Sequence, residues 1–173
     1  PEGGLAKEVD LFGGEFNAFT SFDYTCYYIN SPKANLVQSS DILIDMVSDP
    51  LFLEKDLPAE REVVFEEYKR SQDSPQQYNF QLIQRHSFPA GYRHPILGTQ
   101  DTIKSFSLKQ LKEFRNQYYS LANALIVVAG DLSDKNIKEQ VIQNIKKHQL
   151  PTGKSSQFPK FKLNEEDKSL AWC

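Results

Sequence analysis

The feature that most constrains the fold is an early run of aromatic and β-branched residues, EFNAFTSFDYTCYYIN, at positions 15–30. Such residues favour β-strands, and the polar positions near Ser21–Asp23 predict a turn between two of them. A hairpin so near the start predicts an antiparallel or mixed sheet rather than a regular series of parallel βαβ units.

Most of the remaining sequence has the spacing of helices. Apolar residues at helical intervals predict helices over 5–12, 34–50, 58–70, 78–88, 107–119 and 133–149. The continuous apolar run NALIVVAGD predicts one more strand, at the centre of a sheet, and loops are expected over 71–77 and 89–100. The predicted fold class is α+β, with helices packed on one face of a mainly antiparallel sheet.

The chain has 173 residues, of which 39% are hydrophobic, and this length suits one ordinary domain. We expect residues 1–150 to form most of one α+β domain. Residues 151–173 are expected to form a linker, PTGKSSQFPK, and the start of a further strand at FKL. Position 1 is Pro and no signal peptide is visible, so we expect a piece of a longer protein and predict no compartment.

Composition excludes several classes of function. A net charge of −3 without a local basic cluster argues against nucleic-acid binding, and no apolar run approaches the roughly 20 residues that span a bilayer. Cys26 and Cys173 make neither a disulfide framework nor a metal-binding spacing, and Cys26 is expected to be a small buried apolar residue. His86, His94 and His148 form no helical pair, so each is expected to be a surface residue or a structural residue of a loop.

Two carboxylates lie on the side of a helix that its apolar residues predict to be buried. At about 100° per residue, one apolar arc is defined by Leu57, Val63, Val64 and Tyr68. Glu60 and Glu67, two turns apart, fall inside that arc. Glu62 and Glu66 point the other way, and Glu66 is expected to pair with Arg70.

The cost of burying a charge leaves three interpretations of Glu60 and Glu67 open. A buried ionised carboxylate needs a partner, so the pair could form salt bridges with an arginine elsewhere in the chain. The helix face could instead be less buried than its pattern predicts. The functional interpretation is a metal-ligating or acid–base carboxylate supported by a second one.

A polar residue, Asn17, interrupts the first predicted strand just after Gly13 and Gly14. Two interpretations stay open for it. The strand could hold a single satisfied asparagine. Alternatively, it could be an edge strand that pairs with an extended peptide, with Asn17 holding a main-chain group.

Four stretches in one order resemble the pitrilysin/insulinase family of zinc metallopeptidases, which includes the mitochondrial processing peptidase. They are GGEFNAFTSFDYTCYY, EREVVFEEYKRSQDSP, HPILGTQDTIKSFSLKQLKEFRNQYY and NALIVVAGDLS. The resemblance runs from Pro1 to about His148 and implies a metallopeptidase half-domain. The family carries an inverted zinc motif, H-x-x-E-H, with a distant Glu as third ligand. That motif is not in this chain, and the family spacing places it about ten residues before Pro1.

The resemblance implies roles for six residues. Glu67 matches the third zinc ligand and Glu60 the accompanying carboxylate, while the general base would be the Glu of the missing motif. The substrate-pairing strand would comprise Asn17, Ala18, Phe19 and Thr20. Zinc is expected in the intact parent protein and not in residues 1–173 alone, which we predict to have no stoichiometric zinc and no peptidase activity.

The implied function is that of a fragment of a zinc-dependent endopeptidase that hydrolyses extended peptides. Its substrate chamber would be completed by a second related half-domain, in the same chain or in a partner subunit. The alternative is a non-catalytic, substrate-holding or structural partner subunit of the same family. Retention of both Glu60 and Glu67 favours the active form. An unrelated α+β interaction domain is the more distant possibility.

Overall fold

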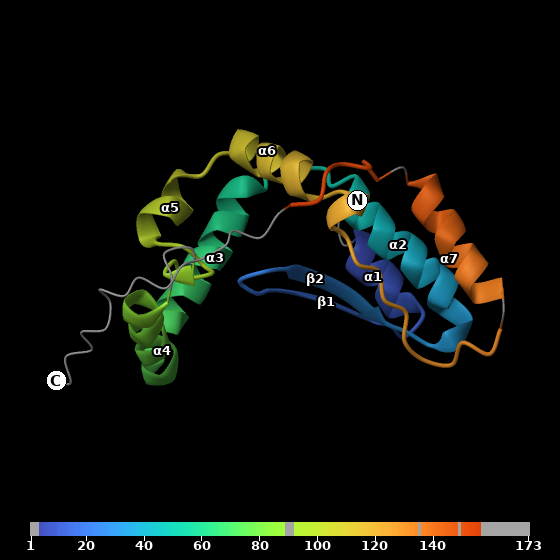
Figure 1. The fold of residues 1–173 in the computed structure, drawn as a ribbon, viewed down its shortest axis with the longest axis horizontal. Helices are drawn as coiled ribbons and strands as arrows, with labels where there is room; N and C mark the ends of the chain where they lie inside the picture. Colours follow the sequence, from blue (N-terminus) through green and yellow to red (C-terminus); the bar gives the residue numbers. More distant parts are fainter. Residues whose placement is uncertain (1–3, 89–91, 135, 149, 157–173) are drawn as a thin grey trace. The chain divides into compact units, whose positions relative to one another are not determined.

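The computed structural model describes residues 4–88, 92–134, 136–148 and 150–156. They form helices and a two-stranded antiparallel sheet (Figure 1), which confirms the α+β class. The described residues divide into two compact units, the first made of 4–51 with 112–156 and the second of 52–111. Each unit is described by itself below.

The first unit contains the hairpin and the helices around it. Its elements are α1 (Gly4–Leu11), β1 (Glu15–Thr20), β2 (Thr25–Asn30), α2 (Leu36–Ser48) and α7 (Asn136–Lys147), with 3-10 turns at Lys33–Asn35 and Leu121–Asn123. The second unit contains α3 (Leu57–Asp73), α4 (Pro75–Ser87) and α5 (Gln100–Ser105). Helix α6 (Leu108–Tyr118) begins in the second unit and continues into the first.

The predicted hairpin is present with its turn where the sequence places it. β1 and β2 pair antiparallel from Glu15 opposite Asn30 to Thr20 opposite Thr25. The turn is closed by the amide of Ser21, which donates to the carbonyl of Tyr24 at 2.8 Å. Within the described residues β1 pairs only with β2, so its other edge carries no strand.

The core of the first unit lies between α1, the hairpin, α2 and α7. Helices α2 and α7 run side by side (Figure 1), and α2 also contacts β2. The most deeply buried apolar side chain is Val9 of α1, which is 1% exposed. The buried apolar residues of the paired helices are Ile42, Ile44, Ile137 and Val141. Ile137 and Val141 lie one turn apart on one face of α7, as its amphipathic pattern predicts. Ile42 and Ile44 lie on different sides of α2, a helix that contacts both α7 and β2.

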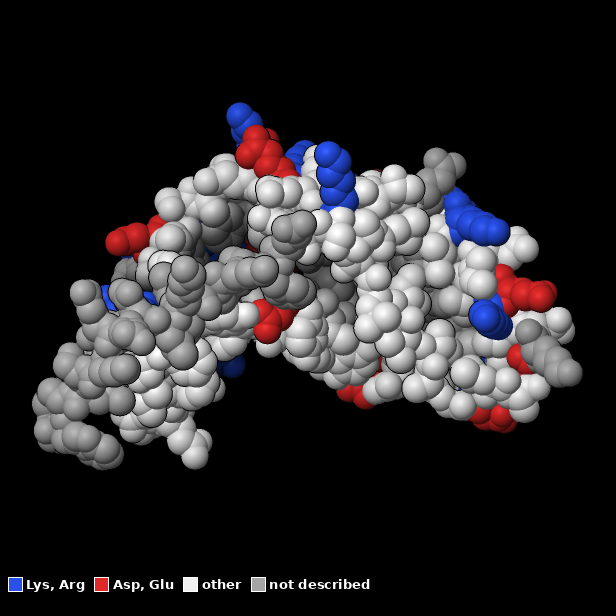
Figure 2. Space-filling model, in the orientation of Figure 1, with Lys and Arg blue, Asp and Glu red and all other residues white. Residues whose placement is uncertain are grey.

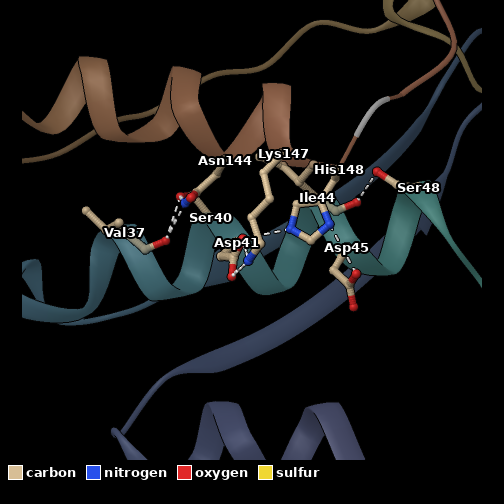
Figure 3. A network of polar contacts seen from close by, with 9 residues as sticks. All are labelled: Val37, Ser40, Asp41, Ile44, Asp45, Ser48, Asn144, Lys147 and His148. Atoms are coloured by element: carbon tan, nitrogen blue, oxygen red, sulfur yellow. Dashed lines mark hydrogen bonds and ion pairs between the residues drawn. The ribbon is translucent and has the colours of Figure 1, made fainter.

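A polar network joins α2 to the end of α7 (Figure 3). The Asp41 carboxylate accepts from Lys147 Nζ at 2.8 Å and lies 2.7 Å from His148 Nε2. The other ring nitrogen of His148 lies 3.2 Å from Asp45 Oδ1. His148 lies in the turn that follows α7 and its side chain is 12% exposed, so it is a loop residue with a structural role, as predicted, held against α2 by two carboxylates.

This network gives Asp41 a pH-dependent role in stability. The hydrogen bond from Lys147, with a smaller one from His148, holds the pKa of the Asp41 carboxyl below its usual value of about 3.9. Asp41 therefore contributes stability above about pH 4, and this contribution is lost as the pH falls through the lower folded-state pKa. We expect Asp41→Asn to destabilise the protein by about 0.5–1 kcal/mol at neutral pH, because the pair is partly exposed to solvent.

Thermal unfolding of the wild type and of Asp41→Asn between pH 7 and pH 2 measures this contribution. The difference in Tm should be largest at neutral pH and should shrink on acidification. The exposed Asp10 of α1 supplies a control variant, Asp10→Asn, which should follow the wild type throughout. A Tm difference that stays constant down to pH 2 would assign the effect to packing rather than to ionisation.

The strand predicted over NALIVVAGD is wrong in the described structure. Residues 124–129 form no strand, and Leu125 and Val127 are 87% and 74% exposed. An apolar run forms a central strand only when other strands pair with both of its edges. No described segment pairs with these residues, so most of their side chains remain exposed to solvent. The strand predicted at FKL lies outside the described residues.

Two further boundaries differ from prediction in the second unit. The loop expected over 71–77 shrinks to Ser74, because α3 continues to Asp73 and α4 begins at Pro75. The Ser74 hydroxyl accepts from the amide of Gln77, and proline suits the first position of a helix, so one residue suffices to separate the helices.

In the first unit, Cys26 is half-buried rather than buried.

Candidate functional site

Helix α3 forms as the sequence predicts and carries both candidate carboxylates. Pro58 lies in its first turn, where a missing amide costs nothing. The helix packs against α4 and α5, and Leu57, Val64 and Tyr68 are half-buried there.

Of the three interpretations of Glu60 and Glu67, the structure supports a helix face that is less buried than its pattern predicts. Glu60 and Glu67 are exposed, and Val63 between them is 52% exposed. Neither carboxylate makes a hydrogen bond or ion pair with another described side chain, so the predicted salt bridge to an arginine is not present among the described residues. The apolar arc is only partly covered because α4 and α5 pack against one side of it.

Glu60, Val63 and Glu67 form a continuous exposed stripe along α3. At about 100° per residue, the three lie within roughly 60° of one another around the helix axis. The stripe thus presents two carboxylates, two turns apart, with an apolar side chain between them. We call these three residues the α3 stripe.

The α3 stripe has the right chemistry for one ligand of a zinc centre but not for a whole one. A carboxylate oxygen is a regular zinc ligand, and Glu67 has no competing partner among the described residues. A catalytic zinc needs three protein ligands. Among the described residues no group of three or more His, Cys, Asp and Glu side chains is placed to hold a metal. His86 and His94 are exposed, as predicted.

The outward carboxylate of Glu66 has a different partner from the predicted one. Its Oε1 lies 2.6 Å from Lys69 Nζ, three residues on, rather than pairing with Arg70. The same ammonium lies 4.7 Å from the centroid of the Phe65 ring. Lys69 therefore makes a cation–π contact as well as the ion pair. Arg70 lies on another side of the helix from Phe65 and makes neither contact.

Helix α5 is an element that the sequence prediction missed. Thr99 and Thr102 cap each other reciprocally at its start, and Asp101 lies in its first turn. A threonine N-cap followed by an acid in the first turn is the signal that could have revealed it. The Lys104 ammonium of α5 lies 5.2 Å from the Phe65 ring, which attaches α5 to α3.

The four residues predicted to pair with substrate lie on β1. Since Ser21 and Tyr24 are a hydrogen-bonded pair, the alternation of an antiparallel ladder turns the amide and carbonyl of Ala18 and Thr20 away from β2. These groups therefore face the open edge of β1. The Asn17 side chain is exposed, and its Oδ1 accepts from the Ala18 amide at 2.8 Å.

This hydrogen bond gives the Asn17 side chain a partner within its own strand, and it leaves open whether β1 also pairs with a peptide. The Asn17 carboxamide occupies an edge donor that an unpaired strand would leave open. The structure describes β1 and the α3 stripe separately, because β1 belongs to the first unit and α3 to the second.

Two surface properties of the described residues bear on charge and on membrane spans. On the face drawn in Figure 2, the described lysine and arginine side chains stand among acidic ones and form no basic patch. No described helix combines the length and the apolar character that a membrane span requires.

Comparison with known proteins identifies the family. The model of the insulinase family, peptidase family M16, matches residues 1–100, and that of the peptidase M16 inactive domain matches residues 105–170. An uncharacterized zinc protease of Bacillus subtilis, YmxG, is 37% identical over 138 residues, which are 78% of this chain and 33% of that protein. The mitochondrial-processing peptidase subunit beta of Dictyostelium discoideum is 29% identical over 84% of this chain and 32% of its own.

A solved structure agrees with these relatives. The crystal structure of a protease from Helicobacter pylori has a TM-score of 0.77 and 30% identity, over 93% of this chain and 39% of that one. The chain thus spans about a third of the length of the relatives it matches. With a family model covering more than half of its residues, the chain belongs to the insulinase family of metallopeptidases, peptidase family M16.

Proposed function

We propose that this chain is part of a zinc-dependent endopeptidase, to which it supplies the distal zinc ligand Glu67 and a substrate-pairing strand. The observation that carries the proposal is the α3 stripe: two exposed carboxylates without described partners, in a chain whose relatives include zinc proteases. An exposed carboxylate without a hydrogen-bond or ion-pair partner among the described residues is available to a metal ion.

The two carboxylates of the α3 stripe have different roles at the metal. Glu67 contributes one carboxylate oxygen and a negative charge to the zinc site. Glu60, two turns earlier on the same side, adds a second negative charge that orients and tunes the site. When bound, zinc supplies polarisation of the scissile carbonyl and a lowered pKa for its bound water.

The free edge of β1 holds the peptide in this proposal. An extended peptide adds to an open strand edge through main-chain hydrogen bonds, which require no particular side chains. Ala18 and Thr20 offer their amides and carbonyls to such a peptide, and Phe19 continues the strand between them. The Asn17 carboxamide, now on the Ala18 amide, can turn to a main-chain group of the peptide once the peptide takes its place.

Metal removal from the longer parent protein tests the function. We expect the parent to cleave an unstructured fluorogenic peptide, to lose that activity when a chelator removes its metal, and to regain it with zinc. Residues 1–173 alone should bind no stoichiometric zinc and cleave nothing. Undiminished cleavage by parent protein shown to be free of metal would contradict the proposal.

A non-catalytic partner subunit is the second candidate. It draws support from the match of residues 105–170 to the peptidase M16 inactive domain. The sequence upstream of Pro1 in the parent discriminates the two, because the enzyme requires an H-x-x-E-H ending about ten residues before it. A parent without that motif would be the non-catalytic subunit.

A further inference from the structure

Arg61 ties α3 to the end of α5. Its Nη2 donates to the main-chain carbonyl of Phe106 at 2.6 Å, and its guanidinium carbon lies 5.1 Å from the centroid of the Phe106 ring. Phe106 is the extended residue that follows the last residue of α5, Ser105. The guanidinium thus satisfies a backbone acceptor next to the helix end and stacks on the ring of the same residue.

The charge of Arg61 is not placed there to neutralise an acid. The side chain is half-buried, and among the described residues it makes no ion pair. Its Nε is buried with no described hydrogen-bond partner. Leaving a buried donor unsatisfied costs free energy, and an apolar residue at position 61 would not have this cost. The contacts of Arg61 with Phe106 offset it. What the arginine supplies is a defined geometry between α3 and α5.

This geometry sets the direction in which the α3 stripe points. Arg61 lies about 100° around the helix from Glu60 and about 120° from Glu67. One turn after Arg61, Phe65 of α3 contacts Lys104 of α5 at 5.2 Å. These two contacts, from Arg61 and Phe65 four residues apart on α3, attach one side of α3 to α5 and to the residue that follows it. Fixing one side of the helix therefore fixes the carboxylates on the other.

We propose that Arg61 is a positioning residue for the metal site, which holds the α3 stripe at the angle that its ligand requires. This inference rests on the proposed function, since it takes Glu67 to be a zinc ligand. Arg61 does not touch the metal or the substrate; it acts through α3. Groups that orient metal ligands typically contribute about 10–100-fold to metal affinity, and a contact through the helix should lie near the lower end.

The test measures the zinc dissociation constant of the full-length parent at a temperature where every variant is folded. Arg61→Met keeps the apolar stem and removes the hydrogen bond and the stacking. We expect it to weaken zinc binding about tenfold and to lower kcat for a peptide more than it raises KM. Arg61→Lys, which can still donate to the carbonyl and lie over the ring, should restore most of the affinity.

Arg115 offers a matched control in the first unit. Its guanidinium donates to the carbonyl of Ser48, the last residue of α2, and its Nε is likewise buried without a described partner. Arg115→Met should therefore lower the Tm about as much as Arg61→Met does, but leave the zinc affinity unchanged. Equal zinc affinities in the wild type and in Arg61→Met would overturn the positioning role.

Two more variants keep the outcome decisive. If Arg61→Met does not fold, Phe106→Leu removes the stacked ring, keeps the carbonyl, and should weaken zinc binding several-fold; unchanged affinity would refute the inference. Glu67→Gln tests the proposed function separately. If that variant retains full zinc affinity, the ligand assignment is wrong and the role of Arg61 falls with it. If Glu67→Gln loses zinc but Arg61→Met binds it as tightly as the wild type, only the role of Arg61 is rejected.

Discussion

Glu67→Gln in the full-length parent should reduce bound zinc from near one per chain to a small fraction and abolish peptide cleavage. The amide keeps the size of the carboxylate but loses its charge, and its remaining oxygen is a far weaker ligand. The exposed position of Glu67 makes this a functional rather than a folding effect, because a surface substitution changes stability by only about 0.5 kcal/mol. Zinc content by mass spectrometry and cleavage of a fluorogenic peptide measure the two losses.

The same helix contains the control. Glu66→Gln removes an equal charge one residue away, on the side where Glu66 pairs with Lys69 in solvent, and should leave zinc and activity at the wild-type level. Glu60→Gln should give an intermediate loss, because it supports the site without completing it. Full zinc occupancy in Glu67→Gln would show that Glu67 is not a ligand.

Ala18→Pro in the parent should lower kcat/KM for extended peptides by about tenfold or more. Proline removes the amide that Ala18 turns to the open edge of β1, and one lost main-chain hydrogen bond worth roughly 1.4 kcal/mol is a tenfold effect. The hairpin itself should survive, because an outward-facing edge position is where a sheet tolerates proline. Circular dichroism and zinc content should remain close to the wild type.

Thr25→Pro is the matched control, since Thr25 opposes Thr20 at the start of β2 and turns its amide to the other edge of the hairpin. It introduces the same ring into the same hairpin without touching the proposed peptide edge. Equal effects of Ala18→Pro and Thr25→Pro on kcat/KM would indicate damage to the hairpin and would remove β1 as the substrate-pairing strand.

The sequence predicted the local elements of the fold best. The hairpin over residues 15–30 depends on neighbouring residues and a short turn, so its strands and its register follow from local pattern. The helices α2, α3 and α7 likewise follow from their own periodicity. Helix α5 was missed because its signal is a six-residue segment with a cap, which is too short for a periodic pattern.

Predictions that depend on distant partners failed for a common reason. The apolar run at 124–129 and the burial of Glu60 and Glu67 were both inferred from local polarity, but burial is decided by what packs against a segment. The structural role predicted for His148 is confirmed, but its partners Asp41 and Asp45 lie on another helix and could not be named from the sequence.

The candidate site likewise has features that follow from local sequence and features that depend on distant residues. The spacing of Glu60 and Glu67 placed them on one side of a helix, and the structure agrees, because helical geometry is local. Their roles came from the resemblance to a family, whose membership is confirmed. The attachment through Arg61 and Phe106 spans 45 residues and leaves no periodic trace in the sequence. Contacts of that kind appear only once the chain is folded.

The most direct test of the proposed site is a crystal structure of the zinc-loaded parent, with the metal located by its anomalous scattering. We expect a single zinc peak with a carboxylate oxygen of Glu67 about 2.0–2.2 Å away, and with two further ligands from residues outside this chain. A zinc ion bound by three protein ligands that do not include Glu67 would contradict the central claim.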